Sequence, residues 1–245
     1  MDDTEFLPMR VSTFDELIGQ GGIERGSTVL IAGACGAGKS IFAMQSAYYS
    51  ALAGENVYYL TFEEDPERIK RHMEINFGWN IKAVEREKNL VVESTDPFEI
   101  AMAIDTEVVA WREKKIPFHV EVIGHDVPQG VDRIVIDSLS ALSAAFIDKD
   151  KYRLYLKVLF DDLNRKNSVN FLVTEVKQDL SGHTGLDIEA FQSDGVIVLY
   201  NTKKGNDRER SLEILKLRFS EHVTETVPFK ITGKGIEIFP EEKVF

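Results

Sequence analysis

The sequence GACGAGKS, residues 33–40, decides the fold, because it follows the G-x-x-x-x-G-K-S/T pattern of a phosphate-binding loop, or P-loop. Its members are Gly33, Ala34, Cys35, Gly36, Ala37, Gly38, Lys39 and Ser40. Glycines in such a loop let backbone N–H groups turn toward a phosphate, and the N-terminus of the next helix adds partial positive charge. Lys39 would supply a full positive charge, and the Ser40 hydroxyl would coordinate Mg²⁺. The pattern predicts nucleotide binding, against the alternative of a glycine-rich turn with an ordinary surface lysine.

The segments on either side of residues 33–40 have the character that a P-loop requires. Thr28–Ala32 is apolar and predicts a buried strand. After the loop, apolar residues recur at helical spacing, at Ile41, Met44, Tyr48 and Leu52. Gly54 then offers a stop for this helix. A strand, a loop and a helix therefore follow one another in the order of a P-loop.

Composition limits the class of protein. The chain has 245 residues, 43% of them hydrophobic, with a formal net charge of -12. This length suits one α/β domain or two small ones, and because no linker divides the sequence, a single domain over residues 1–245 is expected. The acidic balance argues against a protein whose main task is to grip nucleic acid, because such binding neutralises phosphates with basic residues. The chain has one cysteine, no apolar run as long as a membrane span and no secretory signal, so a cytoplasmic protein without a membrane partner is expected.

Apolar periodicity predicts alternating strands and helices over the first two thirds of the chain. Further strands are expected at 57–61, 90–92, 133–137 and 171–174, and helices after Pro66, over 100–111 and over 152–163. A capping box at Thr13–Glu16 predicts a short helix that ends near Gly19. Later segments look extended, at 195–200, 211–217, 228–231 and 235–239. This order predicts an α/β fold, a mainly parallel twisted sheet flanked by helices with a C-terminal antiparallel extension.

Carboxylates follow two of the predicted strands. Asp137 ends the strand at 133–137, where loop-type ATPases use an aspartate for the Mg²⁺ shell; the alternative is a strand-end or helix-cap residue before Ser138. Glu63 and Glu64 follow the strand at 57–61, and a carboxylate there can deprotonate the water that attacks a γ-phosphate. The alternative, an acidic first turn of the next helix, is compatible with that role.

Three basic residues, Lys216, Arg218 and His222, lie along and just after a late predicted strand. Alternation along a strand places Lys216 and Arg218 on one face. From the spacing alone, a solvated basic face is the simpler interpretation.

The chain resembles a single-domain member of the KaiC-like group of RecA-type ATPases, from about Val11 to Phe239. Besides the loop, the matching blocks are Phe14-Asp15-Glu16-Leu17 with Gly21-Gly22-Ile23, Thr61-Phe62-Glu63-Glu64, Val135-Ile136-Asp137-Ser138-Leu139-Ser140, Thr174-Glu175, and Lys216-Leu217-Arg218 with His222. The resemblance implies a RecA-like P-loop fold and a Mg²⁺-dependent ATPase with a regulatory or signalling role. It also implies a homo-oligomeric ring, typically six-membered, with ATP between subunits.

The resemblance further implies roles for individual residues. Glu63 is expected to activate water, with Glu64 in support, and Lys39 to hold the phosphates of ATP with the rest of the loop. Ser40 and Asp137 are expected to hold Mg²⁺.

The basic residues Lys216, Arg218 and His222 are expected, by the same resemblance, to reach across a subunit boundary to the neighbour's nucleotide. Such a charge stabilises the γ-phosphate only when the ring closes correctly. Phe219 follows Arg218 where the family usually has glycine, which predicts a difference in local strand geometry.

Two other functions stay open. A recombinase-like ATPase in DNA recombination or repair predicts DNA-stimulated hydrolysis. By resemblance the loop expected at Gln178–Ala190 would face DNA, but it carries the acidic residues Asp179, Asp187 and Glu189 and no lysine or arginine. A scaffold module that binds ATP with negligible turnover would use nucleotide to set its assembly and its choice of protein partner. Autophosphorylation as in the circadian clock protein is not expected, because Ala190-Phe191 stands where that protein has Ser and Thr.

Overall fold

A large mixed sheet forms the centre of the protein. The computed structural model describes residues 5–114, 127–176 and 188–242. Within these ranges nine strands form one sheet in the order β11-β10-β9-β8-β3-β7-β6-β4-β5. Neighbouring strands from β8 to β5 are parallel, and β9, β10 and β11 extend the sheet in antiparallel fashion. The predicted α/β fold with an antiparallel extension is confirmed.

The parallel strands are β3 (Thr28–Gly33), β4 (Val57–Thr61), β5 (Leu90–Ser94), β6 (Arg133–Asp137), β7 (Val169–Glu175) and β8 (Gly195–Lys204). The extension consists of β9 (Asp207–Leu217), β10 (Val227–Thr232) and β11 (Gly235–Ile238). The helices are α1 (Lys39–Leu52), α2 (Pro66–Phe77), α3 (Ile81–Arg86), α4 (Pro97–Lys114), α5 (Leu139–Ala145), α6 (Lys149–Arg165) and α7 (Ile188–Gln192). We refer to the end of the sheet where the parallel strands begin as the amino edge, and to the end where they finish as the carboxyl edge.

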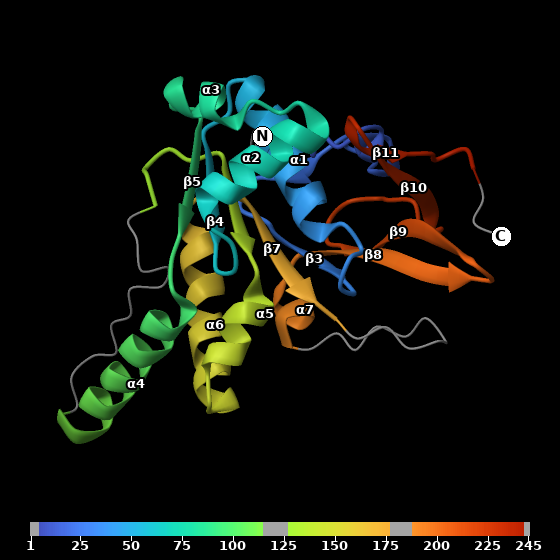
Figure 1. The fold of residues 1–245 in the computed structure, drawn as a ribbon. Helices are drawn as coiled ribbons and strands as arrows, with labels where there is room; N and C mark the ends of the chain where they lie inside the picture. The colour runs from blue at the N-terminus through green and yellow to red at the C-terminus, as the bar shows by residue number, and fades with distance from the viewer. Residues whose placement is uncertain (1–4, 115–126, 177–187, 243–245) are drawn as a thin grey trace.

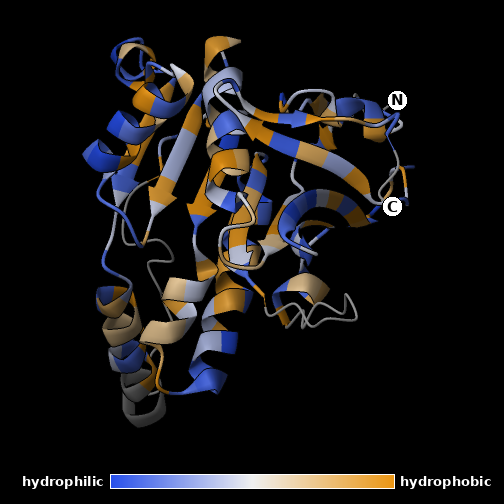
Figure 2. Cartoon of the chain, turned by 45° about the vertical axis from the view of Figure 1, so that its right-hand side comes forward, coloured by the Kyte–Doolittle hydropathy of each residue, from blue (hydrophilic) through white to orange (hydrophobic). Residues whose placement is uncertain are grey.

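Helices cover both faces of the parallel part of the sheet (Figure 1). One core contains side chains of α1, α2 and α3 together with the N-terminal segment and β10 and β11. The other contains side chains of α4, α5 and α6. Hydrophobic residues are concentrated on the strands, and polar residues lie on the outer faces of the helices (Figure 2). Among the described helices, none is long and apolar enough to cross a membrane.

Local signals explain why several predicted elements are confirmed. The Asp65 side chain caps α2 by accepting from the backbone N–H of Arg68 at 3.0 Å, and Pro66 occupies the first helical position. Gly78 ends the same helix with φ of 72°, a left-handed conformation that glycine adopts without cost. The strand predicted at 57–61 is β4, and the long amphipathic helix predicted at 152–163 is α6.

The capping box predicted at Thr13–Glu16 is wrong. Phe14–Leu17 forms a 3₁₀ turn, and Thr13 makes no side-chain cap; its hydroxyl donates instead to the Ile238 carbonyl at 3.0 Å. A tertiary contact with β11 has therefore replaced the local one. The helices α3, α5 and α7, and a two-stranded sheet of β1 (Phe6–Leu7) and β2 (Ile23–Glu24), were not predicted. These elements are too short for a clear apolar period. Residues 178–187 of the loop predicted at Gln178–Ala190 lie outside the described residues, and its last part belongs to α7.

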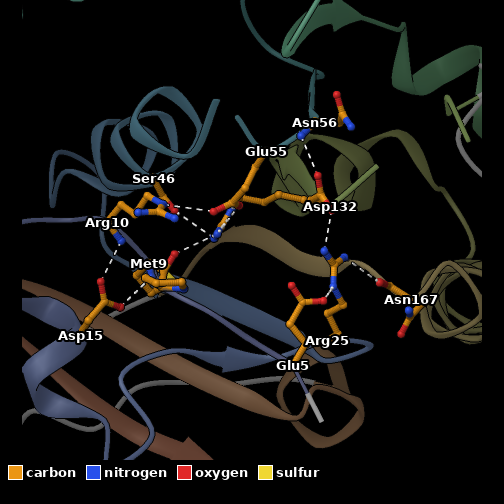
Figure 3. A network of polar contacts seen from close by, with 12 residues as sticks. Glu5, Met9, Arg10, Asp15, Arg25, Ser46, Glu55, Asn56, Asp132 and Asn167 are labelled. Atoms are coloured by element: carbon orange, nitrogen blue, oxygen red, sulfur yellow. Dashed lines mark hydrogen bonds and ion pairs between the residues drawn. The ribbon is translucent and has the colours of Figure 1, made fainter. Parts of the chain in front are cut away.

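A buried polar network holds the N-terminal segment against the amino edge (Figure 3). Arg133, the first residue of β6, is 0% exposed, and its guanidinium donates to Glu55 at 2.8 Å and to the Pro8 carbonyl at 2.9 Å. Arg10 pairs with the same carboxylate at 3.1 Å. Asp15 accepts backbone N–H groups at the start of the segment, including that of Arg10 at 3.0 Å. A neighbouring group joins Arg25 with Glu5, Asp132 and Asn167.

Candidate nucleotide site

Residues 33–40 form a loop between the end of β3 and the start of α1, at the carboxyl edge. Gly36 and Gly38 have φ of 73° and 105°, in the left-handed region that favours glycine. Gly33 is needed for space, because a Cβ atom there would lie 2.5 Å from the Leu199 carbonyl oxygen. The loop therefore has the backbone that the motif requires, and α1 presents its N-terminus to the same place.

Lys39, the first residue of α1, lies among carboxylates. Its Nζ donates to the Ala34 carbonyl within the loop at 3.0 Å. Burial lowers the pKa of Lys39, and the negative charges of Glu175 and then Asp137 oppose that shift. A bound phosphate would be a further counter-charge, so the site favours an anion beside Lys39.

Asp137 ends β6 beside the loop, and its side chain is almost fully buried. Its Oδ2 accepts from the Tyr59 hydroxyl at 2.7 Å, and the Ser40 hydroxyl is a second hydrogen-bond partner. Burial raises the pKa of Asp137, whereas the hydrogen bonds from Tyr59 and Ser40 lower it. The helix-cap alternative does not hold, because Ser138 is the N-cap of α5.

The donor set at this position fits Mg²⁺. Ser40 and Asp137 together offer a hydroxyl and a carboxylate, the hard oxygen ligands that Mg²⁺ takes. Within the described residues, no group of three or more His, Cys, Asp and Glu side chains could hold a metal ion. A site with few protein ligands, completed by phosphates and water, is typical of Mg²⁺ in nucleotide enzymes.

Glu63 and Glu64 follow β4 but have different partners. Thr61 Oγ1 accepts from the backbone N–H of Glu63 at 3.3 Å and of Glu64 at 3.2 Å, which shapes the turn. Glu63 Oε1 accepts from the Ser138 hydroxyl, next to Asp137. Glu64 instead approaches Arg68 of α2, at 3.9 Å. Glu63 is therefore the glutamate that the fold ties to Asp137 and the loop.

Hydroxyl residues that the sequence analysis assigned no role support this arrangement. Ser140 Oγ accepts from the backbone N–H of Glu175 at 2.6 Å and lies 3.3 Å from Thr174 Oγ1. These contacts join the start of α5 to the end of β7. Glu175 was not predicted as a site residue. A signal was present in the sequence, because Thr174 and Glu175 end a strand much as Thr61 and Glu63 do.

Lys216 and Arg218 lie together, far from the loop of the same chain. Lys216 Nζ donates to the Ala190 carbonyl at 3.0 Å, and the Arg218 guanidinium donates to the Phe191 carbonyl at 3.3 Å and to Asp194 at 3.2 Å. Both side chains thus contact the C-terminal end of α7, where the last carbonyls have no partner within the helix. The prediction that they share one side of the strand is confirmed.

Strand register places these cations at the amino edge. Arg218 N–H donates to the Asp194 carbonyl, and Asp194 N–H donates to the carbonyl of Thr28, the first residue of β3. The loop begins at the other end of β3, about 16 Å away at the usual rise per residue. Lys216 also pairs with Val196, which belongs to the core on the face opposite α1. Within one chain, therefore, this pair and the loop lie at opposite edges and on opposite faces.

A bulge at Leu215 sets the direction of Lys216. The register shifts between Val196 and Ile197, so that Ile197 pairs with Ile214 and Val196 pairs with Lys216. If the strand were regular and had no bulge, Lys216 would share the face of Ile214 and point toward the other core.

His222 and Phe219 occupy the turn after β9. His222 forms an isolated bridge with Ile18, and its Nδ1 lies 3.2 Å from the Ser220 carbonyl oxygen, so no contact joins it to Lys216 or Arg218 among the described residues. Phe219 has φ of 61°, the conformation that glycine favours. The chain thus forms a left-handed turn with phenylalanine in it; whether the strand geometry differs from that of the family stays a prediction.

Comparison with known proteins agrees with this geometry. A family model described as "ATPase: KaiC" matches residues 7–243. The chain belongs to the KaiC ATPase family. Circadian clock oscillator protein KaiC of Parathermosynechococcus lividus is 32% identical over 236 residues, which are 92% of this chain and 41% of that protein. KaiC of Synechococcus elongatus is 30% identical over 236 residues, 94% of this chain and 43% of that protein.

The chain thus spans about two fifths of the length of these KaiC relatives. Among solved structures, a KaiC-like protein from the hyperthermophilic archaeon Pyrococcus horikoshii matches with a TM-score of 0.77 and 29% identity, over 97% of this chain and 100% of that chain. The comparisons therefore show the RecA-type P-loop fold and membership of the KaiC ATPase family for this chain.

Proposed function

We propose that this KaiC-family chain is a Mg²⁺-dependent ATPase in which residues 1–245 act as one unit. The observation that carries the proposal is the meeting of Lys39, Asp137 and Glu63 at the carboxyl edge, beside a loop with the backbone of a phosphate cradle. The acidic composition and the single cysteine support a cytoplasmic enzyme that does not act mainly by binding DNA. The family resemblance supports a regulatory role.

Different residues of the chain bind the phosphates, hold the metal and activate the attacking water. Residues 33–40 bind the β- and γ-phosphates through backbone N–H groups and Lys39. Mg²⁺, when bound, would be held by Ser40 and Asp137 and would neutralise charge on the phosphate oxygens. Glu63 accepts the proton of a water whose oxygen attacks the γ-phosphorus. The bond to the β–γ bridging oxygen breaks, and ADP and phosphate leave.

A second copy of the chain completes this site in the proposal. Lys216 and Arg218 lie at the amino edge and on the other face, so they are unable to reach their own chain's loop. A head-to-tail ring brings the amino edge of one subunit to the carboxyl edge of the next, which supplies positive charge to the γ-phosphate in trans. The family resemblance supports a six-membered ring and a place for His222 in the same boundary.

The two glutamates provide the sharpest test. Glu63→Gln is expected to lower kcat for ATP by about 100-fold or more, because general-base catalysis contributes about 10² to 10⁴. Glu64→Gln, the matched control, should stay within about tenfold of the wild type, because its carboxylate faces Arg68. Phosphate release measures kcat, and a fluorescent ATP analogue checks that both variants still bind nucleotide.

An equally active Glu63→Gln variant would remove Glu63 as the base. Nucleotide binding with negligible wild-type turnover would favour the scaffold module. The same assay with single-stranded DNA separates the recombinase alternative, since strong stimulation would place the chain with DNA-processing ATPases.

A further inference from the structure

We propose that Phe219 is an apolar anchor that docks on the carboxyl edge of a second copy of this chain, beside the arginine that enters the neighbour's site. The inference rests on the proposed head-to-tail assembly and adds the contact that makes it specific. Two properties of Phe219 carry it, its backbone conformation and its exposure.

The backbone at Phe219 is costly for its side chain. Its φ of 61° lies in the left-handed region, which a Cβ atom disfavours. Glycine would adopt the same turn without that cost. The Phe219 side chain is 87% exposed, so packing inside its own chain does not offset the strain. A strained residue that makes no compensating contact indicates a role outside the folded chain.

The surroundings of Phe219 give it the character of an interface. Arg218 precedes it and donates to the carbonyl of Phe191, another aromatic residue, whose side chain is 78% exposed. Arg218 is therefore close to two exposed aromatic residues, Phe219 through the sequence and Phe191 through a backbone contact. Aromatic residues and arginine are the types enriched at the energetic centres of protein interfaces.

The carboxyl edge offers a complementary surface. Glu63 and Glu64 are exposed there and carry negative charge, opposite in sign to Arg218. An exposed apolar side chain also follows a strand at this edge: Phe98, 60% exposed, comes soon after β5. Arg218 and Phe219 at the amino edge thus have counterparts at the carboxyl edge, in the carboxylates of Glu63 and Glu64 and in the exposed ring of Phe98. Such a pair of different surfaces makes a heterologous contact that can close into a ring.

The test combines assembly and stability in one variant, Phe219→Gly. Relief of the left-handed strain should raise the unfolding midpoint of the dilute, nucleotide-free protein by about 1 to 4 °C, after allowance for the greater flexibility of unfolded glycine. Loss of the phenyl side chain should weaken the contact between subunits by about tenfold or more in Mg-ATP. Light scattering over a concentration series measures assembly, and Ile75→Ala, which truncates a 73% exposed side chain on α2, is the matched control.

A variant that folds more stably and assembles less well is a combination that a purely structural role does not produce. Assembly of Phe219→Gly at wild-type concentrations would overturn the anchor while leaving the proposed ring intact. A wild-type protein that stays monomeric while it binds and hydrolyses Mg-ATP would overturn both the ring and the anchor. Phe219→Leu, which keeps an apolar side chain, should assemble better than Phe219→Gly.

Discussion

Replacement of Glu55 by glutamine tests the polar network that attaches the N-terminal segment to the sheet. Glu55 accepts two hydrogen bonds from the guanidinium of Arg133, at 2.8 and 3.2 Å, and one from Arg10 at 3.1 Å. Arg133 is 0% exposed, so Glu55→Gln leaves a buried cation without its carboxylate. The nearby charge of Asp15 interacts with Arg133 but forms no ion pair with it among the described residues.

The expected cost is large for one substitution. Removal of one partner of a buried ion pair typically costs about 3 to 5 kcal/mol. Glutamine keeps the shape and one acceptor oxygen, which places Glu55→Gln near the lower figure, about 3 kcal/mol. The side chain of Arg10 is 34% exposed and can turn to water, so its lost contact adds little. For a chain of this size, the unfolding midpoint should fall by about 6 to 12 °C.

Thermal and denaturant unfolding of nucleotide-free protein measure the effect. The double variant Glu55→Gln/Arg133→Met should be more stable than Glu55→Gln alone, because it removes the uncompensated charge. Arg153→Gln, which breaks an exposed pair with Asp150, is the control and should leave the midpoint nearly unchanged. A midpoint for Glu55→Gln within 2 °C of the wild type (about 0.5 to 1 kcal/mol), or a double variant less stable than the single one, would refute the reasoning.

Two further predictions concern the loop and the base. Gly33→Ala should lower the unfolding free energy by about 2 kcal/mol or more, because its Cβ atom would meet the Leu199 carbonyl oxygen at 2.5 Å; an unchanged denaturation curve would show that the strand ends are not so close. Ser138→Ala should lower kcat by about tenfold with little change in KM, because Glu63 loses the hydroxyl that positions it. If KM rises and kcat stays constant, Ser138 acts in binding and not through Glu63.

Local signals carried much of the fold. The loop glycines, the cap and proline at the start of α2, and the apolar period of α6 each depend on neighbours in sequence, and the structure has these elements where the residues predict them. The capping box predicted at Thr13 does not form, because the Thr13 hydroxyl donates to a residue distant in sequence, the Ile238 carbonyl. The spacing of residues within a short segment does not predict such a long-range contact.

In the site, too, local signals were predictable from the sequence and long-range contacts were not. Sequence placed Asp137, Glu63 and Glu64 at strand ends, and parallel register brings those ends to one edge. The spacing of the residues did not separate the two glutamates, which only the family resemblance ranked. The structural distinction depends on Ser138, which lies 75 residues from Glu63. The direction of Lys216 likewise depends on the bulge at Leu215, for which a single extended segment carries no signal.

A mixing experiment tests most directly the central claim that two copies of the chain build each site. Glu63→Gln inactivates the carboxyl edge of a subunit, and Arg218→Ala inactivates its amino edge, so each variant alone should hydrolyse ATP very slowly. In an equal mixture, one boundary in four pairs an intact Glu63 with an intact Arg218, and about a quarter of wild-type turnover should return. Turnover that stays at the level of the separate variants after subunit exchange would contradict the claim.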